Sequence, residues 1–481
     1  MKLSQLICEL ETITRPDVDT EITAVCYDSR KVTNGSAFIC LVGTNFDGHE
    51  YASLAEKAGA SVIIAQKQTE SALPHVIVRD SREAMFEIAA QWFGHPERDM
   101  KFVGVTGTNG KTSTVFYIKS MLDKMGKKTG LIGTVSNMIG DKTLPSASTT
   151  PEPYALFELL SQMRDENVEY VAMEISSHSL DQKRVSGIKF EVAVFINLTQ
   201  DHLDYHGTME NYKKAKFGIF ELAKTAVINI DDETGKEFAD MVNIPKYTYS
   251  TIYNSADFVA KEIKIRVNGV KFLAVTRGGI AKVYAPTPGG FTVYNILAAI
   301  GAVSALGFEF SEIEPTLSEI VGVCGRAEII SGNRPYTVMI DYAHTPDGVE
   351  NILSSVREYA QGRVITLFGC GGNRDKTKRP IMGSIAAKYS DYVIVTSDNP
   401  RTEQPMSIIE DILPGVQSVK TPYTVIENRQ EAIKFAIENA KENDVIVLAG
   451  KGHEDYQVIG TQKIPFDEHA IAKKYMEDME K

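Results

Sequence analysis

Short apolar runs rich in β-branched residues alternate along the chain with stretches of helical periodicity. The runs predict strands at 102–106, 170–175, 192–198, 226–230, 337–340, 364–368, 392–396 and 445–448. Residues 83–93 have the pattern of an amphipathic helix, and Gly94 and Pro96 follow its end. Strands separated by helical stretches are typical of parallel α/β units, so the pattern predicts an α/β protein.

A chain of 481 residues is too long for one hydrophobic core, and about three domains of ordinary size are expected. The segments near 94–101 and 322–328 are the predicted linkers, and we expect them to act as hinges. In open parallel sheets, ligands bind beyond the carboxyl ends of the strands. The polar residues that follow the predicted strands are therefore the candidates for chemistry.

The composition narrows the class of protein. A formal net charge of −12 argues against nucleic-acid binding. No run approaches the roughly 18 apolar residues that span a bilayer, and the start MKLSQLICELETI lacks the apolar stretch of a signal peptide. We expect a cytoplasmic protein that does not insert into membranes. The five cysteines form no CxxC pair, which argues against a disulfide framework or a thiolate zinc site.

The segment 107–112, Gly-Thr-Asn-Gly-Lys-Thr, lies between a predicted strand and a predicted helix. Backbone N–H groups in that context cradle phosphates, so the candidate ATP-binding residues are Gly107, Thr108, Asn109, Gly110, Lys111, Thr112 and Ser113. Lys111 is expected to contact the β- and γ-phosphates and Thr112 to bind Mg²⁺. Val105 departs from the general phosphate-loop pattern. A plain turn could use the same glycines, but it would not require Lys-Thr at the helix start.

The loop form TGTNGKT is similar to that of the Mur ligases and folylpolyglutamate synthetases. Further blocks follow in order from Asp28 to Glu454: Asp28-Ser-Arg30, Asp47-Gly-His49, Ser148-Thr-Thr-Pro151, Met173–His178, Asn197–Gly207, Gly325–Glu328, Asp341–Pro346, Gly371–Asp375, Ser397–Arg401 and Ala449–Glu454. With these blocks the chain resembles the Mur ligase family over nearly its whole length.

The resemblance implies three domains: an N-terminal UDP-binding α/β domain (1–98), a central parallel-sheet ATPase domain of the P-loop type (99–325) and a C-terminal Rossmann-like domain that binds an amino acid (326–481). It also implies a reaction in peptidoglycan precursor synthesis. ATP phosphorylates the D-glutamate carboxylate of a UDP-linked muramoyl dipeptide, and the amine of meso-diaminopimelate attacks the acyl phosphate. The implied partners are these small molecules, and the implied state is a monomer.

The resemblance also assigns catalytic roles to Lys111, Glu174, His202 and Lys216. Thr112, Glu174, His202 and a carbamylated Lys216 are the implied Mg²⁺ ligands. An ammonium group would be repelled by Mg²⁺, whereas a carbamate is an oxygen donor. The plain alternatives are a hydrogen-bonded structural histidine and, for Lys216, a solvated lysine face.

Three further sets of residues carry implied substrate contacts. The rest of the ATP site is Asn295, Arg326 and Asp341, although Asn295 could cap a helix and Arg326 could tie two domains together. The UDP-sugar-peptide is assigned to Ser29, Thr149, Thr150, Ser176, Gln182 and Arg184. The incoming amino acid is assigned to Arg374, Asp398, Asn399, Pro400, Arg401, Gly450 and Glu454. Diaminopimelate differs from lysine by a distal carboxylate, which an arginine fork binds with two hydrogen bonds.

Three other functions stay open from the sequence. They are a lysine-adding ligase of the same type, a folylpolyglutamate synthetase, and a nucleotide-binding protein with a degenerate site. The blocks at 173–178 and 398–401 count against the folate enzyme, and the intact set of Lys111, Glu174, His202 and Lys216 counts against a degenerate site.

Overall fold

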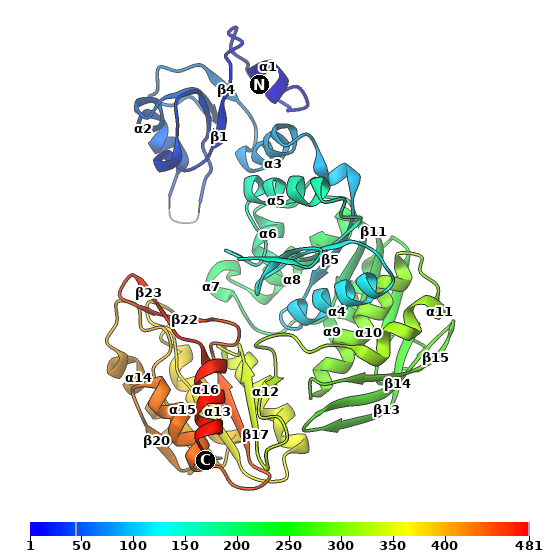
Figure 1. The fold of residues 1–481 in the computed structure, drawn as a ribbon. Helices are drawn as coiled ribbons and strands as arrows, with labels where there is room; N and C mark the ends of the chain where they lie inside the picture. The colour runs from blue at the N-terminus through cyan, green and yellow to red at the C-terminus, as the bar shows by residue number, and fades with distance from the viewer. Residues whose placement is uncertain (44–45, 480–481) are drawn as a thin grey trace.

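The computed structural model describes residues 1–43 and 46–479, which form three α/β domains in chain order (Figure 1). The N-terminal domain contains a parallel sheet of four strands in the order β1-β2-β3-β4. Its strands are β1 (Ala24–Cys26), β2 (Ser36–Ile39), β3 (Ala60–Ala65) and β4 (His75–Ile77), and its helices are α1 (Leu3–Leu6), α2 (Ala52–Lys57) and α3 (Ser81–Trp92).

Helix α3 joins the N-terminal domain to the central one. Asp80 caps it by accepting hydrogen bonds from the backbone N–H groups of Arg82 and Glu83. Met85 and Ile88 pack into the N-terminal core, whereas Phe86 packs into the core of the central domain. The helix predicted at 83–93 is therefore present, and its apolar residues serve two cores rather than one.

The central domain is built on a mixed sheet of eleven strands. Its strands are β5 (Lys101–Thr106), β6 (Thr129–Ile132), β7 (Asn137–Ile139), β8 (Lys142–Leu144), β9 (Tyr170–Glu174), β10 (Phe190–Phe195), β11 (Ala223–Asn229), β12 (Lys246–Ser250), β13 (Phe258–Arg266), β14 (Gly269–Thr276) and β15 (Gly279–Ala285). The order is β15-β14-β13-β12-β11-β10-β5-β9-β6-β7-β8. The run from β12 to β6 is parallel, and the antiparallel strands β14 and β15 extend one edge.

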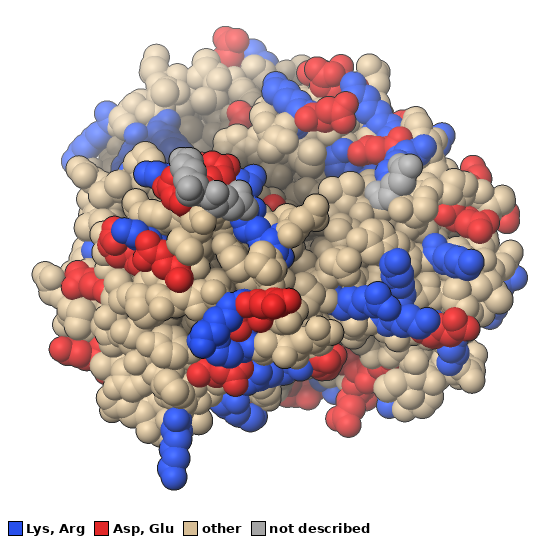
Figure 2. Space-filling view, turned by 60° about the horizontal axis from the view of Figure 1, so that its bottom comes forward, with Lys and Arg blue, Asp and Glu red and all other residues tan. Residues whose placement is uncertain are grey.

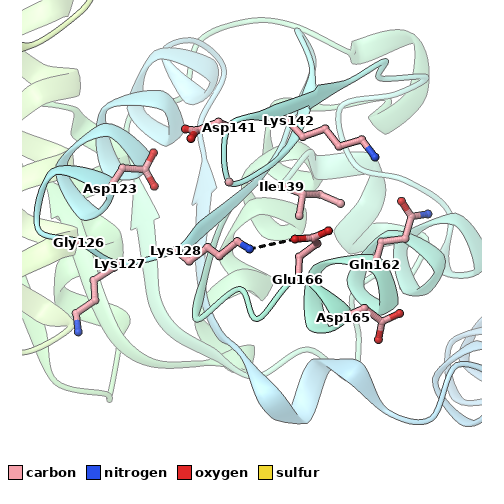
Figure 3. A pocket seen from close by; sticks show the side chains of 11 residues that line it. Asp123, Gly126, Lys127, Lys128, Ile139, Asp141, Lys142, Gln162, Asp165 and Glu166 are labelled. Atoms are coloured by element: carbon pink, nitrogen blue, oxygen red, sulfur yellow. Dashed lines mark hydrogen bonds and ion pairs between the residues drawn. The ribbon is translucent and has the colours of Figure 1, made fainter.

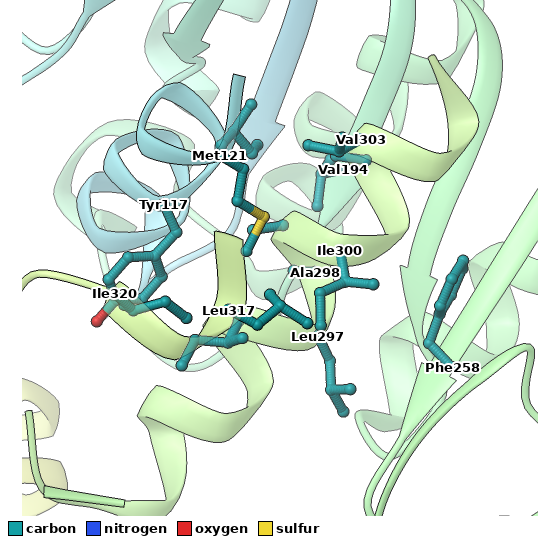
Figure 4. Packing of buried hydrophobic residues seen from close by; sticks show 14 of the residues in the cluster. Tyr117, Met121, Val194, Phe258, Leu297, Ala298, Ile300, Val303, Leu317 and Ile320 are labelled. Atoms are coloured by element: carbon teal, nitrogen blue, oxygen red, sulfur yellow. The ribbon is translucent and has the colours of Figure 1, made fainter. Parts of the chain in front are cut away.

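Helices cover both faces of this sheet. They are α4 (Lys111–Lys124), α5 (Pro153–Asp165), α6 (Ser177–Asp181), α7 (Leu203–His206), α8 (Met209–Phe217), α9 (Glu233–Met241), α10 (Gly290–Ala305) and α11 (Phe310–Ile313). On one face, Tyr117 and Met121 of α4 belong to the same buried cluster as Leu297 and Ile300 of α10 (Figure 4). On the other face, α5 and α9 pack around Phe102 and Phe190. Strand β5 is buried on both faces, and the phosphate loop follows its carboxyl end. The packing of β5 therefore fixes the position of the loop.

The C-terminal domain has a six-stranded sheet in the order β16-β17-β21-β18-β19-β20, parallel except for β16. Its strands are β16 (Glu328–Ile329), β17 (Thr337–Asp341), β18 (Val364–Phe368), β19 (Tyr392–Val395), β20 (Tyr423–Val425) and β21 (Val445–Ala449), and β22 (Tyr456–Ile459) pairs with β23 (Gln462–Pro465) as a separate ribbon. Its helices are α12 (Pro346–Tyr359), α13 (Lys378–Tyr389), α14 (Pro405–Gln417), α15 (Arg429–Glu438) and α16 (Glu468–Asp478).

Acidic and basic side chains are interspersed on the face shown in Figure 2, with no broad field of one sign. Anionic ligands must therefore be held by local groups of cations. None of the helices in the described ranges has the length and apolar character needed to cross a membrane.

Candidate functional site

The strand order of the central sheet brings the candidate catalytic residues together. Strand β5 pairs with β9 on one side and with β10 on the other, all in parallel. The loops that follow these three strands therefore meet at one edge of the sheet. At this edge lie Glu174, the last residue of β9, Lys111, the first residue of α4, and His202, directly before α7.

The phosphate loop ends at Gly110, whose φ of +87° and contact with Asn295 leave no room for a side chain. Lys111 begins α4, and its Nζ donates to the carbonyl oxygens of Gly107 and Thr108 at 2.8 and 2.9 Å. Asn295 lies inside α10, whose cap is Gly289, so the helix-cap alternative for Asn295 is wrong. Its side chain lies against Gly110 of the loop.

Lys216 lies beneath the same loop. Its side chain is 1% exposed, its Nζ donates to the Gly107 carbonyl oxygen at 2.8 Å, and it lies 4.6 Å above the ring of Tyr212. Burial, together with the charge of Lys111, lowers the pKa of Lys216 well below its usual value. The solvated-face alternative is therefore wrong. Two amines converge on one carbonyl oxygen, an arrangement that favours a nearby anion.

Glu174 ends strand β9 and is 1% exposed. Its carboxylate accepts hydrogen bonds from the backbone N–H of Thr134 at 2.8 Å and from the Thr134 hydroxyl at 3.1 Å. The Thr134 hydroxyl also contacts the hydroxyl of Thr149 at 3.0 Å. Thr134 thus connects the candidate catalytic carboxylate to Thr149 of the candidate sugar-peptide set, and no sequence motif indicated this contact.

His202 has a left-handed backbone, with a φ of 53°, directly before α7. Its ring meets the ring of His178 edge-on, with centroids 4.8 Å apart. Burial lowers the pKa of His202 to about 4, so its imidazole is neutral at neutral pH. Neutral imidazole is the form that binds metal ions.

Arg326 reaches from the C-terminal domain to the phosphate loop. Its Nη2 donates to the hydroxyl of Thr112 at 3.1 Å, and its guanidinium lies 4.9 Å from the ring centroid of Tyr342. The Nε of Arg326 is buried and has no hydrogen-bond partner within the described ranges. Asp341 accepts from the backbone N–H groups of Ala327 and Ala343, and burial raises its pKa. Arg326 both ties two domains together and presents a cation to the loop.

Asp347, which sequence reasoning missed, makes a second contact between these domains. Its carboxylate accepts hydrogen bonds from the side-chain amide of Asn109 and, at 2.9 Å, from the hydroxyl of Thr199. It stands one residue beyond the block Asp341–Pro346. Its position directly after that block was the feature of the sequence that could have identified Asp347 as a candidate.

Five of the six sugar-peptide candidates lie in one cluster. Thr150 donates its hydroxyl to the Glu174 carbonyl at 2.8 Å, and Arg184 donates to the Thr150 carbonyl at 2.9 Å. The remaining members of the cluster are Thr149, Ser176 and Gln182. Ser29 lies apart, in a short 3-10 helix of the N-terminal domain.

The amino-acid candidates gather at the carboxyl edge of the C-terminal sheet. Asn399 donates to the Glu454 carboxylate at 2.9 Å, and the buried Lys451 donates to the same carboxylate at 3.0 Å. Gly450 has a φ of +118° and leaves no room for a side chain beside Asp398. These contacts place the Glu454 carboxylate beside Asn399 and the Asp398 carboxylate beside Gly450.

Two arginines lie near Gly371, in the same region of the C-terminal domain. Arg401 has a φ of 53°, and its Nη1 donates to the Gly372 carbonyl at 2.8 Å. The side chains of Arg401 and Arg374 both approach the position that a Cβ would take on Gly371. Pro400, between Asn399 and Arg401, packs its carbonyl against Gly372. Arg374 is exposed, so its guanidinium can turn toward a ligand.

A cavity of about 670 Å³ lies elsewhere on the central domain (Figure 3). It is lined by residues from the C-terminal end of α4, from 139–142 and from 162–166, with Lys128 bonded to Glu166 at 3.1 Å. Helix α4 has 14 residues and is therefore roughly 21 Å long. The cavity lies at the opposite end of α4 from the phosphate loop and contains none of the candidate residues.

This fold and site define an ATP-dependent ligase. Models of three Mur ligase regions match the chain: the family's catalytic domain at 21–93, the middle domain at 105–303 and the glutamate ligase domain at 325–452. The chain belongs to the Mur ligase family.

Particular members of the family resemble the chain over its full length. The UDP-N-acetylmuramoyl-L-alanyl-D-glutamate–2,6-diaminopimelate ligases of Clostridium botulinum and Caldanaerobacter subterraneus are 43% and 44% identical to it, and each alignment covers 100% of both chains. A solved structure of a ligase with the same name is 30% identical, with a TM-score of 0.71, over 100% of this chain and 99% of that one.

Proposed function

We propose that this chain adds meso-diaminopimelate to UDP-N-acetylmuramoyl-L-alanyl-D-glutamate, with hydrolysis of ATP to ADP and phosphate. ATP phosphorylates the γ-carboxylate of the D-glutamate, because a free carboxylate is a poor electrophile. The amine of diaminopimelate then attacks the acyl phosphate, and phosphate leaves from the tetrahedral intermediate. The full-length similarity to diaminopimelate ligases supports this assignment.

The observation that carries the choice of amino acid is the pairing of charges in the C-terminal pocket. Near Gly371 lie the Nη1 of Arg401 and the side-chain stem of Arg374, while Asp398 lies beside Gly450 and Glu454 is bonded to Asn399. Diaminopimelate has a carboxylate and an ammonium group at each end, whereas lysine has no distal carboxylate. A pocket with cations for carboxylates and acids for ammonium groups suits diaminopimelate.

The central site supplies charge neutralisation and alignment. Lys111 and Arg326 face the transferred phosphoryl group, and Thr149, Thr150, Ser176, Gln182 and Arg184 hold the sugar-peptide while Ser29 binds its uridine end. Thr112 and Glu174 are oxygen ligands of the kind that Mg²⁺ prefers, neutral His202 adds an imidazole, and Lys216 fits only as a carbamate. When bound there, Mg²⁺ would neutralise charge on the phosphates.

The same reasoning supports a monomer in the cytoplasm. Its three domains would meet near residues 98 and 325. One chain supplies the UDP, ATP and amino-acid pockets, so no second copy is required. The UDP-linked dipeptide and ATP are cytoplasmic substrates.

The test is a comparison of amino acids in wild type and Arg401→Ala. A site built to pair a charged group of the substrate can discriminate by about 10⁴ in kcat/KM against an analogue that lacks the group. The wild type should use meso-diaminopimelate and largely reject L-lysine. Arg401→Ala should damage diaminopimelate use strongly and change the low lysine rate much less. Product masses and phosphate release measure both rates. Equal use of lysine and diaminopimelate by the wild type would overturn the assignment.

A further inference from the structure

Folding brings Cys324, Glu328 and His469 together beside the linker between the central and C-terminal domains. Cys324 lies in the linker, Glu328 in β16 and His469 in α16. The Nε2 of His469 lies 2.8 Å from the Glu328 carboxylate and 4.0 Å from the Cys324 sulfur. One ligand atom from each of the three residues lies within 4.8 Å of the other two. No spacing rule could show this group, because His469 is 145 residues from Cys324.

We propose that Cys324, Glu328 and His469 form a binding site for Zn²⁺, separate from the reaction site. A thiolate, an imidazole and a carboxylate are the three ligand types that Zn²⁺ takes in proteins. Their present separations are close to those of atoms around one tetrahedral ion, and a small opening of the Glu328–His469 contact would admit it. Water would complete the fourth position.

The surroundings of the three residues support a metal site. The backbone N–H of Gly325 donates to the Glu328 carboxylate at 2.8 Å and so orients it. Behind His469, the Asp467 carboxylate lies 3.8 Å from Nδ1, on the side away from the proposed ion. A carboxylate behind the imidazole is the usual support of a metal-binding histidine. Cys324 is exposed, which gives an ion access from solvent.

The site lies where an ion would affect the reaction without taking part in it. Cys324 and Glu328 flank Arg326, whose side chain reaches Thr112 of the phosphate loop. Gly325 packs against the backbone of Gly452 and His453, so the linker already contacts the loop that carries Glu454. An ion bound by these three residues would fix the linker to α16. It would thereby hold Arg326 and limit hinge motion between the two domains.

The test uses Co²⁺ as a spectroscopic substitute for Zn²⁺ on the full chain after treatment with a chelator. Metal binding removes one proton from the Cys324 thiol and one from the His469 imidazole, whose pKa is raised to about 10 by its hydrogen bonds to Cys324 and Glu328. The thiolate–Co²⁺ bond then gives a charge-transfer absorption in the near ultraviolet. The proposed Mg²⁺ ligands include no sulfur, so this absorption is specific to a cysteine site. Competition with a chromophoric chelator then gives the Zn²⁺ affinity.

We expect the absorption in wild type and in Cys8→Ser, which replaces another exposed cysteine. Cys324→Ser and His469→Gln should abolish it and weaken Zn²⁺ binding about tenfold or more, since even the loss of a supporting residue costs about 10–100-fold. Circular dichroism checks that the variants are folded, and Glu328→Gln, which should weaken binding while keeping the absorption, serves if one is not. Absence of the absorption in wild type, or its persistence in Cys324→Ser, would overturn the proposal and leave a hydrogen-bonded histidine–glutamate pair.

Discussion

Two buried cations, one in the central domain and one in the C-terminal domain, are partnered in opposite ways. Lys216 is 1% exposed, and its amine contacts a carbonyl oxygen and the face of a tyrosine ring. Arg429 is also 1% exposed, but it donates to the Glu468 carboxylate at 2.6 Å and lies 3.8 Å from Asp398. A buried charge without a counter-charge is costly, so the first arrangement calls for an anion that the protein itself does not supply.

The same difference extends to the neighbours of both residues. Lys111, like Lys216, donates to carbonyl oxygens of the phosphate loop. In the C-terminal domain, Lys451 donates to Glu454 and Arg379 to Glu403. The amines of Lys111 and Lys216 are therefore hydrogen-bonded to carbonyl oxygens rather than to carboxylates, whereas Lys451 and Arg379 each have a carboxylate partner. We interpret a buried amine without a carboxylate partner as a group that takes part in function. We interpret a buried cation that is bonded to a carboxylate as a group that stabilises the fold.

Lys216→Met gives the largest expected effect. The change removes an amine whose burial is unfavourable, and methionine fills a similar volume. The free energy of unfolding should stay the same or rise, while turnover should fall about 10³-fold or more, because the proposed carbamate is lost from the site of charge neutralisation. Phosphate release and urea unfolding measure the two quantities.

Lys213→Met, on the same helix, is the matched control, because Lys213 pairs with Glu237 outside the site. It should keep near-normal turnover. Short carboxylic acids should restore part of the activity of Lys216→Ala. Full activity of a protein whose intact mass shows an unmodified Lys216 would remove the carbamate from the mechanism.

Arg429→Met tests the buried cation that has a carboxylate partner. Removing this guanidinium leaves Glu468, which is 0% exposed, without its partner. Breaking a buried pair costs about 3–5 kcal/mol of stability. Urea unfolding, followed by hydrogen exchange in strands β18 and β21, should show that loss in the C-terminal domain.

The double variant Arg429→Met/Glu468→Met sharpens the result. Replacing both partners of a buried pair with apolar residues is often close to neutral, so stability should recover in large part. If Arg429→Met were as stable as the wild type, the distinction between a paired and an unpaired buried cation would fail for this protein.

The sequence predicted the phosphate loop, its helix and eight of the parallel strands, because those features depend on local pattern. It missed the short strands β1 to β4 of the N-terminal sheet and also β6, β12, β13 and β20. Lys111 and Gly110 follow from the spacing of the loop itself. The partner of Arg429 lies 39 residues away on another helix, and no periodicity connects the two. Strands β14 and β15 were missed because an antiparallel extension of 269–285 is exposed on one face and lacks the apolar runs of a buried strand.

Asp347→Ala should have a smaller effect, on the contact between the two regions. The carboxylate joins α12 to Asn109 and Thr199 of the central domain. Hydrogen bonds to a charged group contribute about 1.5–3 kcal/mol, so the balance between joined and separated domains should shift by roughly that amount. Small-angle scattering without ligands should show a larger radius of gyration for Asp347→Ala than for the wild type.

Asn351→Ala is the control, because Asn351 contacts Asp347 without crossing to the central domain. Identical scattering curves for Asp347→Ala and wild type would show that this contact does not hold the domains.

Glu403→Gln should give the smallest effect, and one that depends on pH. The hydrogen bonds from Arg379 lower the pKa of Glu403 from 4.5 to about 2. Because the folded pKa lies below the unfolded one, the stabilisation is complete above pH 4.5 and is lost as pH falls toward 2. The loss cannot exceed about 1.4 kcal/mol per pH unit for one proton. Glu403→Gln should therefore weaken the dependence of the stability of the C-terminal domain on pH in the acid range, as measured by hydrogen exchange in β18 and β19.

Glu410→Gln, which changes an exposed glutamate on α14, should leave this pH dependence unchanged. Lys216→Met should also leave it unchanged in this pH range, because a cation that contacts only a carbonyl oxygen and a ring has no carboxylate partner to titrate. An equal weakening of this pH dependence by Glu403→Gln and Lys216→Met would mean that the two kinds of buried cation are not distinguished by their partners.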